Sequence, residues 1–114
     1  MTKRYKLEAD KLDKWLAQLR DPKSRKTIAR YFDYAGDEMA VEYLQRVRRE
    51  GLPVCGCALG HYFAANLYKS VDCVPYVLCD VDGNLQFEVV NMNDVEQKSL
   101  PEIADWLEAN VERV

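Results

Sequence analysis

The sequence lacks the features that mark membrane-spanning and secreted proteins. Nowhere in its 114 residues is there a run of about 18 apolar residues, the length that a transmembrane helix needs. The N-terminal segment is charged throughout and has no apolar core of the kind found in secretory signal peptides. We therefore expect a cytoplasmic protein that makes no membrane contact and keeps its four cysteines reduced.

Potential metal ligands are also few. The chain has a single histidine, His61, and its cysteines are Cys55, Cys57, Cys73 and Cys79. Together they could supply a tetrahedral zinc site, but there is no C-x2-C pair and Cys79 falls within a predicted strand. We therefore expect no metal and no cofactor, with His61 at the surface or against a phosphate. A Cys-His nucleophile pair has no positioned third group beside it, so we expect no enzyme activity.

Charge is divided unevenly along the chain. Residues 1–50 hold 13 Lys and Arg against 9 Asp and Glu, whereas residues 51–114 hold 3 against 10, for a net charge of −3. This division indicates either different partners for the two halves or one half facing the other. Chains that bind nucleic acid strongly are usually basic overall, so the balance counts against that function.

Hydrophobic periodicity predicts four helices, each with apolar residues three and four apart on one face. They cover residues 9–20, 24–36 and 37–51, and a last segment that begins at Ser99. The predicted core positions are Leu12, Trp15, Leu16 and Leu19 in the first, Ile28, Tyr31, Phe32 and Ala35 in the second, Ala40, Tyr43, Leu44 and Val47 in the third, and Ile103, Trp106, Leu107, Val111 and Val114 in the last.

Capping residues set the expected ends of these helices. A proline disfavours helix in the residue before it, so the first helix should end near Asp21. Gly36 is a typical residue at which to end the second, and Asp37 is the expected N-cap of the third. Ser99 and Glu102 have the spacing of a capping box for the last helix.

Asp82-Gly83 predicts a β-hairpin within VPYVLCDVDGNLQFEVV (74–90), because both central residues of a type I′ turn need positive φ. A lone hairpin is only marginally stable. The hairpin must therefore pack on helices or gain another strand, for which residues 4–8 are a candidate, and a homodimer formed through the hairpin edge is an alternative. The predicted cross-strand pairs on the core face are Tyr76 with Val89 and Leu78 with Phe87.

The stretch IARYFDYAGDEMAVEYLQRVRREGLPVCGCALGHYFAA (28–65) has an ordered series of features. An Ile-Ala pair precedes a turn, a helix with Val41, Leu44 and Val47 follows, and a basic run leads into Gly51-Leu52. In this order residues 22–65 resemble the winged helix-turn-helix domains of small phage and bacterial DNA-binding proteins. The resemblance implies that GLPVC and GHYFA are the two strands of a wing.

The wing has a rival within the same residues. CALGHYFAANLYK (57–69) also has Leu59, Tyr62, Phe63 and Asn66 at helical spacing, although Gly60 weakens such a helix by roughly 1 kcal/mol. Glycines on both sides of a turn suit a wing. We predict the wing and keep the helix as the alternative.

The resemblance also implies which residues contact DNA. The second helix of the pair would lie in the major groove, with basic residues against the phosphates. Asp37, Glu38 and Glu42 at its start would repel phosphates, and the wing tip GCALG has no cation. The candidate DNA- or partner-binding residues are Lys23, Arg25, Lys26, Arg30, Gln45, Arg46, Arg48, Arg49 and His61.

These observations predict an α+β protein with one compact domain over residues 1–114. A winged-helix-like unit would cover residues 8–70, followed by a β-hairpin and a capping helix over residues 71–114. The expected function is that of a small non-enzymatic regulator of phage or mobile-element type, bound to double-stranded DNA. The alternative is an interaction or inhibitory protein on the same scaffold, which acts on host machinery through its acidic C-terminal half.

Overall fold

The computed structural model describes residues 3–66 and 81–114. In these residues the chain is mostly helical. Its elements in chain order are β1 (Tyr5–Leu7), α1 (Ala9–Arg20), α2 (Ala40–Arg49), α3 (Ala58–Asn66), α4 (Gly83–Val90), the π-helical turn η1 (Asn91–Val95), α5 (Leu100–Asn110) and β2 (Val111–Arg113). None of the helices described has the length and apolarity that crossing a bilayer requires.

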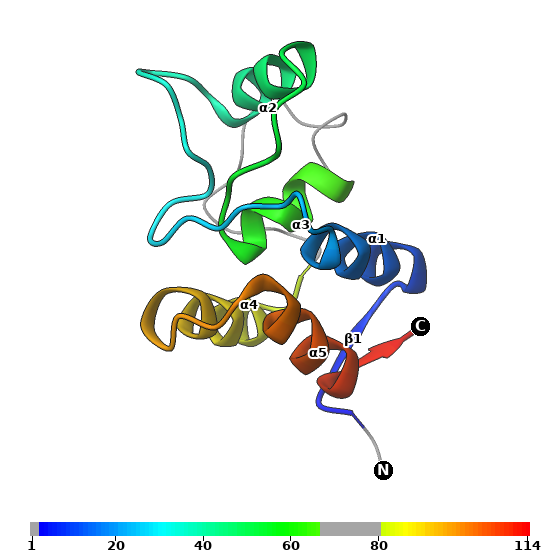
Figure 1. Cartoon of the computed structure of the whole chain (residues 1–114). Coiled ribbons are helices and arrows are strands. Elements are labelled where there is room, and N and C mark those ends of the chain that lie inside the picture. Colours follow the sequence, from blue (N-terminus) through cyan, green and yellow to red (C-terminus); the bar gives the residue numbers. More distant parts are fainter. Residues whose placement is uncertain (1–2, 67–80) are drawn as a thin grey trace.

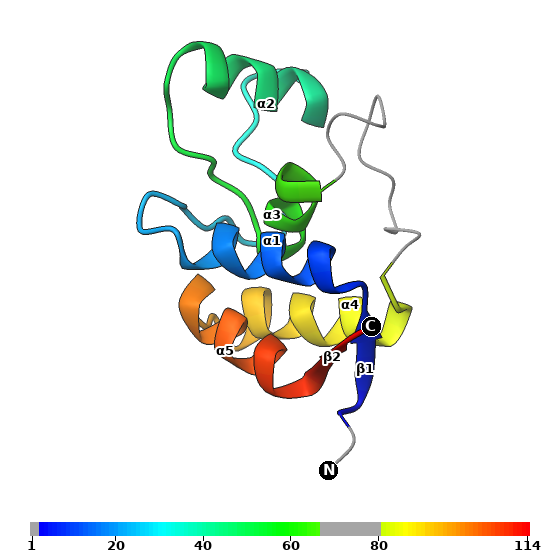
Figure 2. The same ribbon diagram turned by 90° about the vertical axis from the view of Figure 1, so that its right-hand side faces the viewer.

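The helices form three tiers (Figure 1). α1 and α3 pack against each other in the middle tier, with α2 on one side and α4 and α5 on the other. Figure 2 shows the same order from the side, with β1 and β2 together at one end. Two irregular segments, residues 21–39 and 50–57, connect α2 to the middle tier.

One cluster of buried side chains runs through all three tiers. Trp15 of α1 meets Tyr62 of α3 edge to face at a centroid distance of 5.0 Å, and its indole Nε1 donates to the Ala58 carbonyl at 2.9 Å. Phe32 stacks on Tyr43 of α2 at 4.8 Å. Phe32 therefore joins α2 to the rest of the core, although it lies outside any helix.

The two ends of the chain meet in a small parallel sheet. Tyr5 of β1 lies opposite Val111 of β2, and the Val114 amide donates to the Leu7 carbonyl at 3.1 Å. The strand predicted over residues 4–8 is confirmed, but it pairs with the C-terminal segment rather than with a hairpin. Val114 itself is 66% exposed, so its predicted place in the core is wrong.

The helix predicted over residues 24–36 is wrong. The Arg25 amide donates to the Val54 carbonyl at 2.9 Å, and the Asp33 amide donates to the Cys55 carbonyl at the same distance. Ala29 has a φ of +61°, which a helix does not allow. Hydrogen bonds to a distant segment thus replace the local helical ones, and Ile28 is exposed instead of buried.

The third predicted helix is confirmed as α2, but it begins later than expected. Gly36 has a φ of +58°, and Asp37 precedes the first helical residue by three positions. The Glu42 carboxylate accepts from the Met39 amide at 3.0 Å, so Met39 rather than Asp37 is the residue at the N-cap. Its predicted apolar stripe is buried as expected.

The wing is also wrong, and the helical alternative predicted over residues 57–69 is confirmed for residues 58–66, while residues 67–69 lie outside the described residues. Residues Ala58–Asn66 form α3, which is buried over most of its length. Gly60 weakens the helix intrinsically but is required by packing, because a Cβ at this position would collide with the Tyr31 carbonyl oxygen. A helix buried on nearly all sides shows little amphipathic periodicity, which is why the sequence pattern did not distinguish it from strands.

The β-hairpin predicted at Asp82-Gly83 is wrong, because the residues of its second strand form the helix α4. The Asp82 carboxylate accepts from the amides of Asn84 and Leu85, at 2.8 and 3.3 Å, and so caps α4. Within α4, Val89 is buried and Phe87 is exposed. The predicted partners Tyr76 and Leu78 lie outside the described residues, as do Cys73 and Cys79. Because residues 83–90 form a helix, they offer no hairpin edge through which the predicted homodimer could form.

The helix α1 and the start of α5 agree with their predictions, but Val111, predicted on the last helix, lies in β2 because α5 ends at Asn110. α1 ends at Arg20, directly before Asp21-Pro22, and buries all four predicted positions. α5 begins after Ser99, whose hydroxyl accepts from the Glu102 amide at 3.3 Å, while the Glu102 carboxylate accepts from the Ser99 amide at 3.0 Å. Trp106 is half-buried rather than fully buried.

Candidate nucleic-acid interface

Three of the predicted binding residues are engaged within the molecule. The Arg46 guanidinium makes two hydrogen bonds to Glu38, at 2.8 and 3.2 Å, and holds the pKa of that carboxyl below its usual value. Arg30 donates to the carbonyls of Phe32 and Tyr34. Lys26 Nζ donates to the Lys98 carbonyl at 2.7 Å. These three side chains therefore make hydrogen bonds within the protein that help to hold the fold together.

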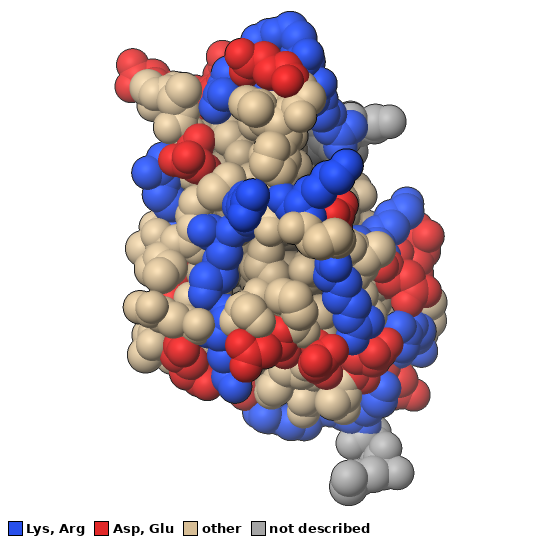
Figure 3. All heavy atoms as spheres, in the orientation of Figure 1, with Lys and Arg blue, Asp and Glu red and all other residues tan. Residues whose placement is uncertain are grey.

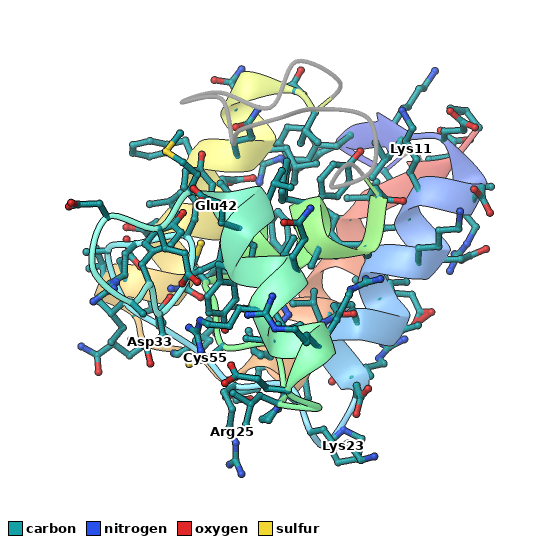
Figure 4. All side chains as sticks on the ribbon, turned by 90° about the horizontal axis from the view of Figure 1, so that it is seen from above. Lys11, Lys23, Arg25, Asp33, Glu42 and Cys55 are labelled. Atoms are coloured by element: carbon teal, nitrogen blue, oxygen red, sulfur yellow. The ribbon has the colours of Figure 1, made fainter. Side chains whose placement is uncertain are left out.

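Three other predicted residues meet around one surface depression. Lys23 and Arg25 lie on the segment after α1, and Arg48 lies near the C-terminal end of α2. All three line a hollow of about 490 Å³ with Pro22, Val47, Gly51, Leu52 and Pro53. Figure 4 shows Lys23 and Arg25 side by side at one edge of the molecule, where both point outward, while Lys11 lies toward the opposite edge.

A second hollow has one lining residue in common with the first. It has a volume of about 580 Å³, and the shared residue is Arg48. Its other lining residues are Lys14, Ala17, Gln18, Asp21, Ala64, Ala65 and Asn66. We call the two hollows together the basic groove. Four cations, Lys14, Lys23, Arg25 and Arg48, line it, against the single carboxylate of Asp21.

The segment that carries Lys23 and Arg25 is held by several hydrogen bonds. The Asp21 carboxylate accepts from the Lys23 amide at 2.9 Å, and the Ser24 hydroxyl donates to the Gln18 carbonyl at 2.7 Å. The Arg25 carbonyl accepts from the Gly56 amide at 3.0 Å. The backbone of Lys23 and Arg25 is therefore held in place by contacts within the protein, without a bound partner.

His61 lies beneath this segment, not at the surface, so that prediction is wrong. Its side chain is fully buried, with Nε2 at 2.8 Å from the Arg25 carbonyl and Nδ1 at 3.1 Å from the Gln18 amide nitrogen. A carbonyl only accepts, so Nε2 carries the proton and Nδ1 accepts from Gln18. Burial holds the pKa of His61 below its ordinary value and keeps the ring neutral.

The cysteines give no sign of metal or redox chemistry in the part of the chain that the structure describes. No group of three or more potential metal ligands occurs within residues 3–66 and 81–114. Cys57 precedes α3, and its sulfur accepts from the Gly60 amide at 3.3 Å. Burial raises the pKa of both the Cys55 and the Cys57 thiol, so each stays protonated near neutral pH.

Charges of both signs are mixed on the face of the molecule shown in Figure 3. Lys and Arg side chains lie over all tiers, while Asp and Glu lie among them near α2 and also form a band over the tier of α4 and α5. Ion pairs also join the two halves. Arg20 contacts Asp105 at 2.9 Å and Glu108 at 3.1 Å. These ion pairs support the expectation that one half faces the other, whereas different partners for the two halves stay a prediction.

Neither the family models, nor the curated proteins, nor the solved structures include a match to this chain. Its function must therefore be argued from the basic groove itself.

Sequence reasoning did not find every residue of the basic groove. It missed Lys14, Gln18 and Asn66. Lys14 and Gln18 are one turn apart on the polar face of α1, which is a weak signal that many surface helices share. Asn66 reaches the groove only because residues 58–66 form a helix. Of the remaining candidates, Gln45 and Arg49 are exposed on α2 but do not line either hollow.

Proposed function

We propose that this chain is a non-enzymatic protein that binds the phosphate backbone of double-stranded DNA through the basic groove. The observation that carries the proposal is the convergence of Lys23, Arg25 and Arg48, which are up to 25 positions apart in the sequence, on one depression together with Lys14. Arginine and lysine are the main phosphate contacts of DNA-binding proteins. A regulatory role of phage or mobile-element type remains part of this proposal.

The proposed mode differs from that of a winged helix. Neither the first helix of the expected pair nor the wing forms, so no helix-turn-helix presents α2 to the major groove. Glu42 also lies in the first turn of α2, where bases would be read. We therefore propose contacts to phosphates, which give affinity with little sequence information.

Fluorescence anisotropy with a labelled mixed-sequence duplex, measured over a salt series, tests the proposal. Four groove cations predict a slope of about −3 to −4 in a plot of log affinity against log salt, because each neutralised phosphate contributes about −0.9. Replacement of Lys23 and Arg48 by Gln should lower affinity at least about tenfold at low salt and make the slope shallower by about two.

Lys6→Gln is the matched control. Lys6 is exposed on β1, at the far end of the molecule from α2, so its loss removes one positive charge without touching the groove, as each of the single replacements Lys23→Gln and Arg48→Gln does within it. The control should bind as the parent does. Absence of duplex binding at low salt, or equal losses in the groove variant and the control, would contradict the proposal.

The second candidate function is the binding of a protein partner through the C-terminal half. Phe87 and Val95 are each 73% exposed on α4 and η1, and a hollow of about 320 Å³ lies beside Val90. Large exposed apolar side chains often mark protein interfaces. The acidic side chains Glu88, Asp94 and Glu96 stand in the same segment, which would suit a basic partner.

This candidate has its own test. Parent protein and Phe87→Ser are immobilised in parallel, and the proteins that each retains from a host lysate are compared. A partner held by the parent and lost by Phe87→Ser supports the candidate, whereas identical sets of retained proteins contradict it. Because Phe87 is exposed, the substitution should leave the fold intact.

A further inference from the structure

We infer that His61 is a positioning residue for DNA binding: its imidazole holds the Arg25 backbone against α1 and makes duplex affinity depend on the protonation state of a buried ring. The inference rests on the proposed function of the basic groove. It concerns a residue that touches no solvent and lines neither hollow.

Each ring nitrogen of His61 is hydrogen-bonded to a residue that lines one of the two hollows. Nε2 donates to the Arg25 carbonyl at 2.8 Å, and Arg25 lines the first hollow. Nδ1 accepts from the Gln18 side chain at 3.1 Å, and Gln18 lines the second hollow beside Lys14 and Arg48. One buried ring on α3 thus links α1 to the segment that carries Arg25.

Protonation would break half of this link. The protonated ring donates from both nitrogens, so Nδ1–H would face the Gln18 Nε2 donor until the amide turns its Oε1 acceptor toward the ring. The ring is desolvated, so water does not replace the original contact. The link as it stands therefore requires a neutral ring, and a charged ring forces the Gln18 side chain to rearrange.

The groups around the ring decide when this happens. Asp21 at the end of α1 favours the charged ring, as do the carbonyl of Arg25 and the backbone at Gly56, but burial opposes it more strongly. Cys57 precedes His61 by one turn, and its carbonyl accepts the His61 amide at 3.0 Å. The cations Arg25, Lys14 and Arg48 line the hollows that adjoin the two hydrogen-bond partners of the ring.

His61→Gln separates protonation from packing, because its side chain carries an amide donor and acceptor but does not titrate. Duplex affinity of the parent and of His61→Gln should agree within about threefold at pH 8. As the pH falls below 6.5, the ordinary pKa of histidine, the parent should lose affinity relative to His61→Gln. Identical pH profiles, or a gain by the parent over His61→Gln at low pH, would overturn the inference.

A double-mutant cycle tests whether His61 acts through Arg25. His61→Leu should weaken duplex binding about as much as Arg25→Ala, and adding His61→Leu to Arg25→Ala should cost nothing further. Lys23→Ala is the matched control, since the ring nitrogens contact Arg25 and Gln18 rather than Lys23, and there the His61→Leu loss should persist in full. Additive losses in the Arg25→Ala background would overturn the inference.

The outcomes remain interpretable if a variant or the proposed function fails. Circular dichroism shows whether His61→Leu is folded; if it is not, the pH profiles of the parent and His61→Gln decide alone. If the parent protein does not bind duplex at any pH, the proposed function fails, and this inference falls with it. If the parent binds but the profiles coincide, only the role of His61 is lost.

Discussion

Single residues in this molecule are constrained by close contacts that leave little room for change. Gly60 shows this most clearly, because the Tyr31 carbonyl lies where its Cβ would be. The Tyr31 carbonyl is held there by the Cys57 amide at 3.0 Å, so it has little freedom to move. α3 and the segment after α1 therefore approach each other as closely as glycine allows.

Gly60→Ala should consequently lower the free energy of unfolding by at least about 2 kcal/mol, since the added methyl meets backbone rather than a flexible side chain. Gly83→Ala is the control, because a Cβ there meets nothing within 4 Å. Urea denaturation followed by circular dichroism compares the two. A Gly60→Ala variant as stable as the control would show that the two segments separate easily.

His61 gives a second prediction at this scale, in the pH dependence of stability. Its pKa is lowered in the folded state from an ordinary value of 6.5, so the unfolded chain takes up a proton at a higher pH than the folded one does. The resulting stability is complete above pH 6.5 and is lost as the pH falls from there toward the folded pKa.

Stability measured by urea denaturation should thus decline more steeply below pH 6.5 for the parent than for His61→Gln, which has no proton to gain. Equal slopes in the two proteins would mean that the ring titrates normally in the folded state. All other titratable groups are the same in both proteins and cancel in the comparison.

At the scale of the elements, capping residues decide where helices begin. Asp82 accepts two amide hydrogen bonds at the start of α4, whereas Asp37 lies three positions before the first residue of α2. Both aspartates looked alike in sequence, as short acidic residues beside a glycine. Only one of them became a cap.

Asp82→Ala should therefore cost about 1 kcal/mol of stability, the usual effect of removing an N-cap. Asp37→Ala, the matched control, should change stability by less than about 0.5 kcal/mol, as most exposed substitutions do. Thermal unfolding of the three proteins measures the difference. Equal effects of the two substitutions would contradict the capping role of Asp82.

At the scale of the whole molecule, the two ends of the chain close the fold. β2 pairs with β1, and Val111 is fully buried beneath that pair. Arg113 of β2 also contacts Asp13 of α1 at 2.8 Å. The segment that follows α5 is thus part of the folded core rather than a free tail.

Removal of residues 111–114 should lower the free energy of unfolding by at least about 2 kcal/mol, which is the effect of exposing one buried valine and losing the strand pair. Val114→Ala, at an exposed position, is the control and should be neutral. Denaturant titration of both proteins gives the comparison. A truncated chain with unchanged stability would place Val111 outside the core.

The sequence by itself determined the elements whose signals are local. α1 and α5 carry apolar stripes with clear ends, and the capping box of Ser99 and Glu102 formed as predicted. α2 and β1 were also found, though with a different start and a different strand partner. In these segments, side chains within one turn of each other supply both the apolar face and the caps, so the pattern is sufficient.

Only the tertiary structure decided the segments whose hydrogen bonds come from elsewhere in the chain. The backbone of Arg25 and Asp33 bonds to residues 54–56, which overrides the helical pattern between them. Asp82-Gly83 suits a turn and a helix start equally well, and burial of α4 selects the helix. The basic groove and the burial of His61 depend on these same long-range contacts, so neither was visible before the chain was folded.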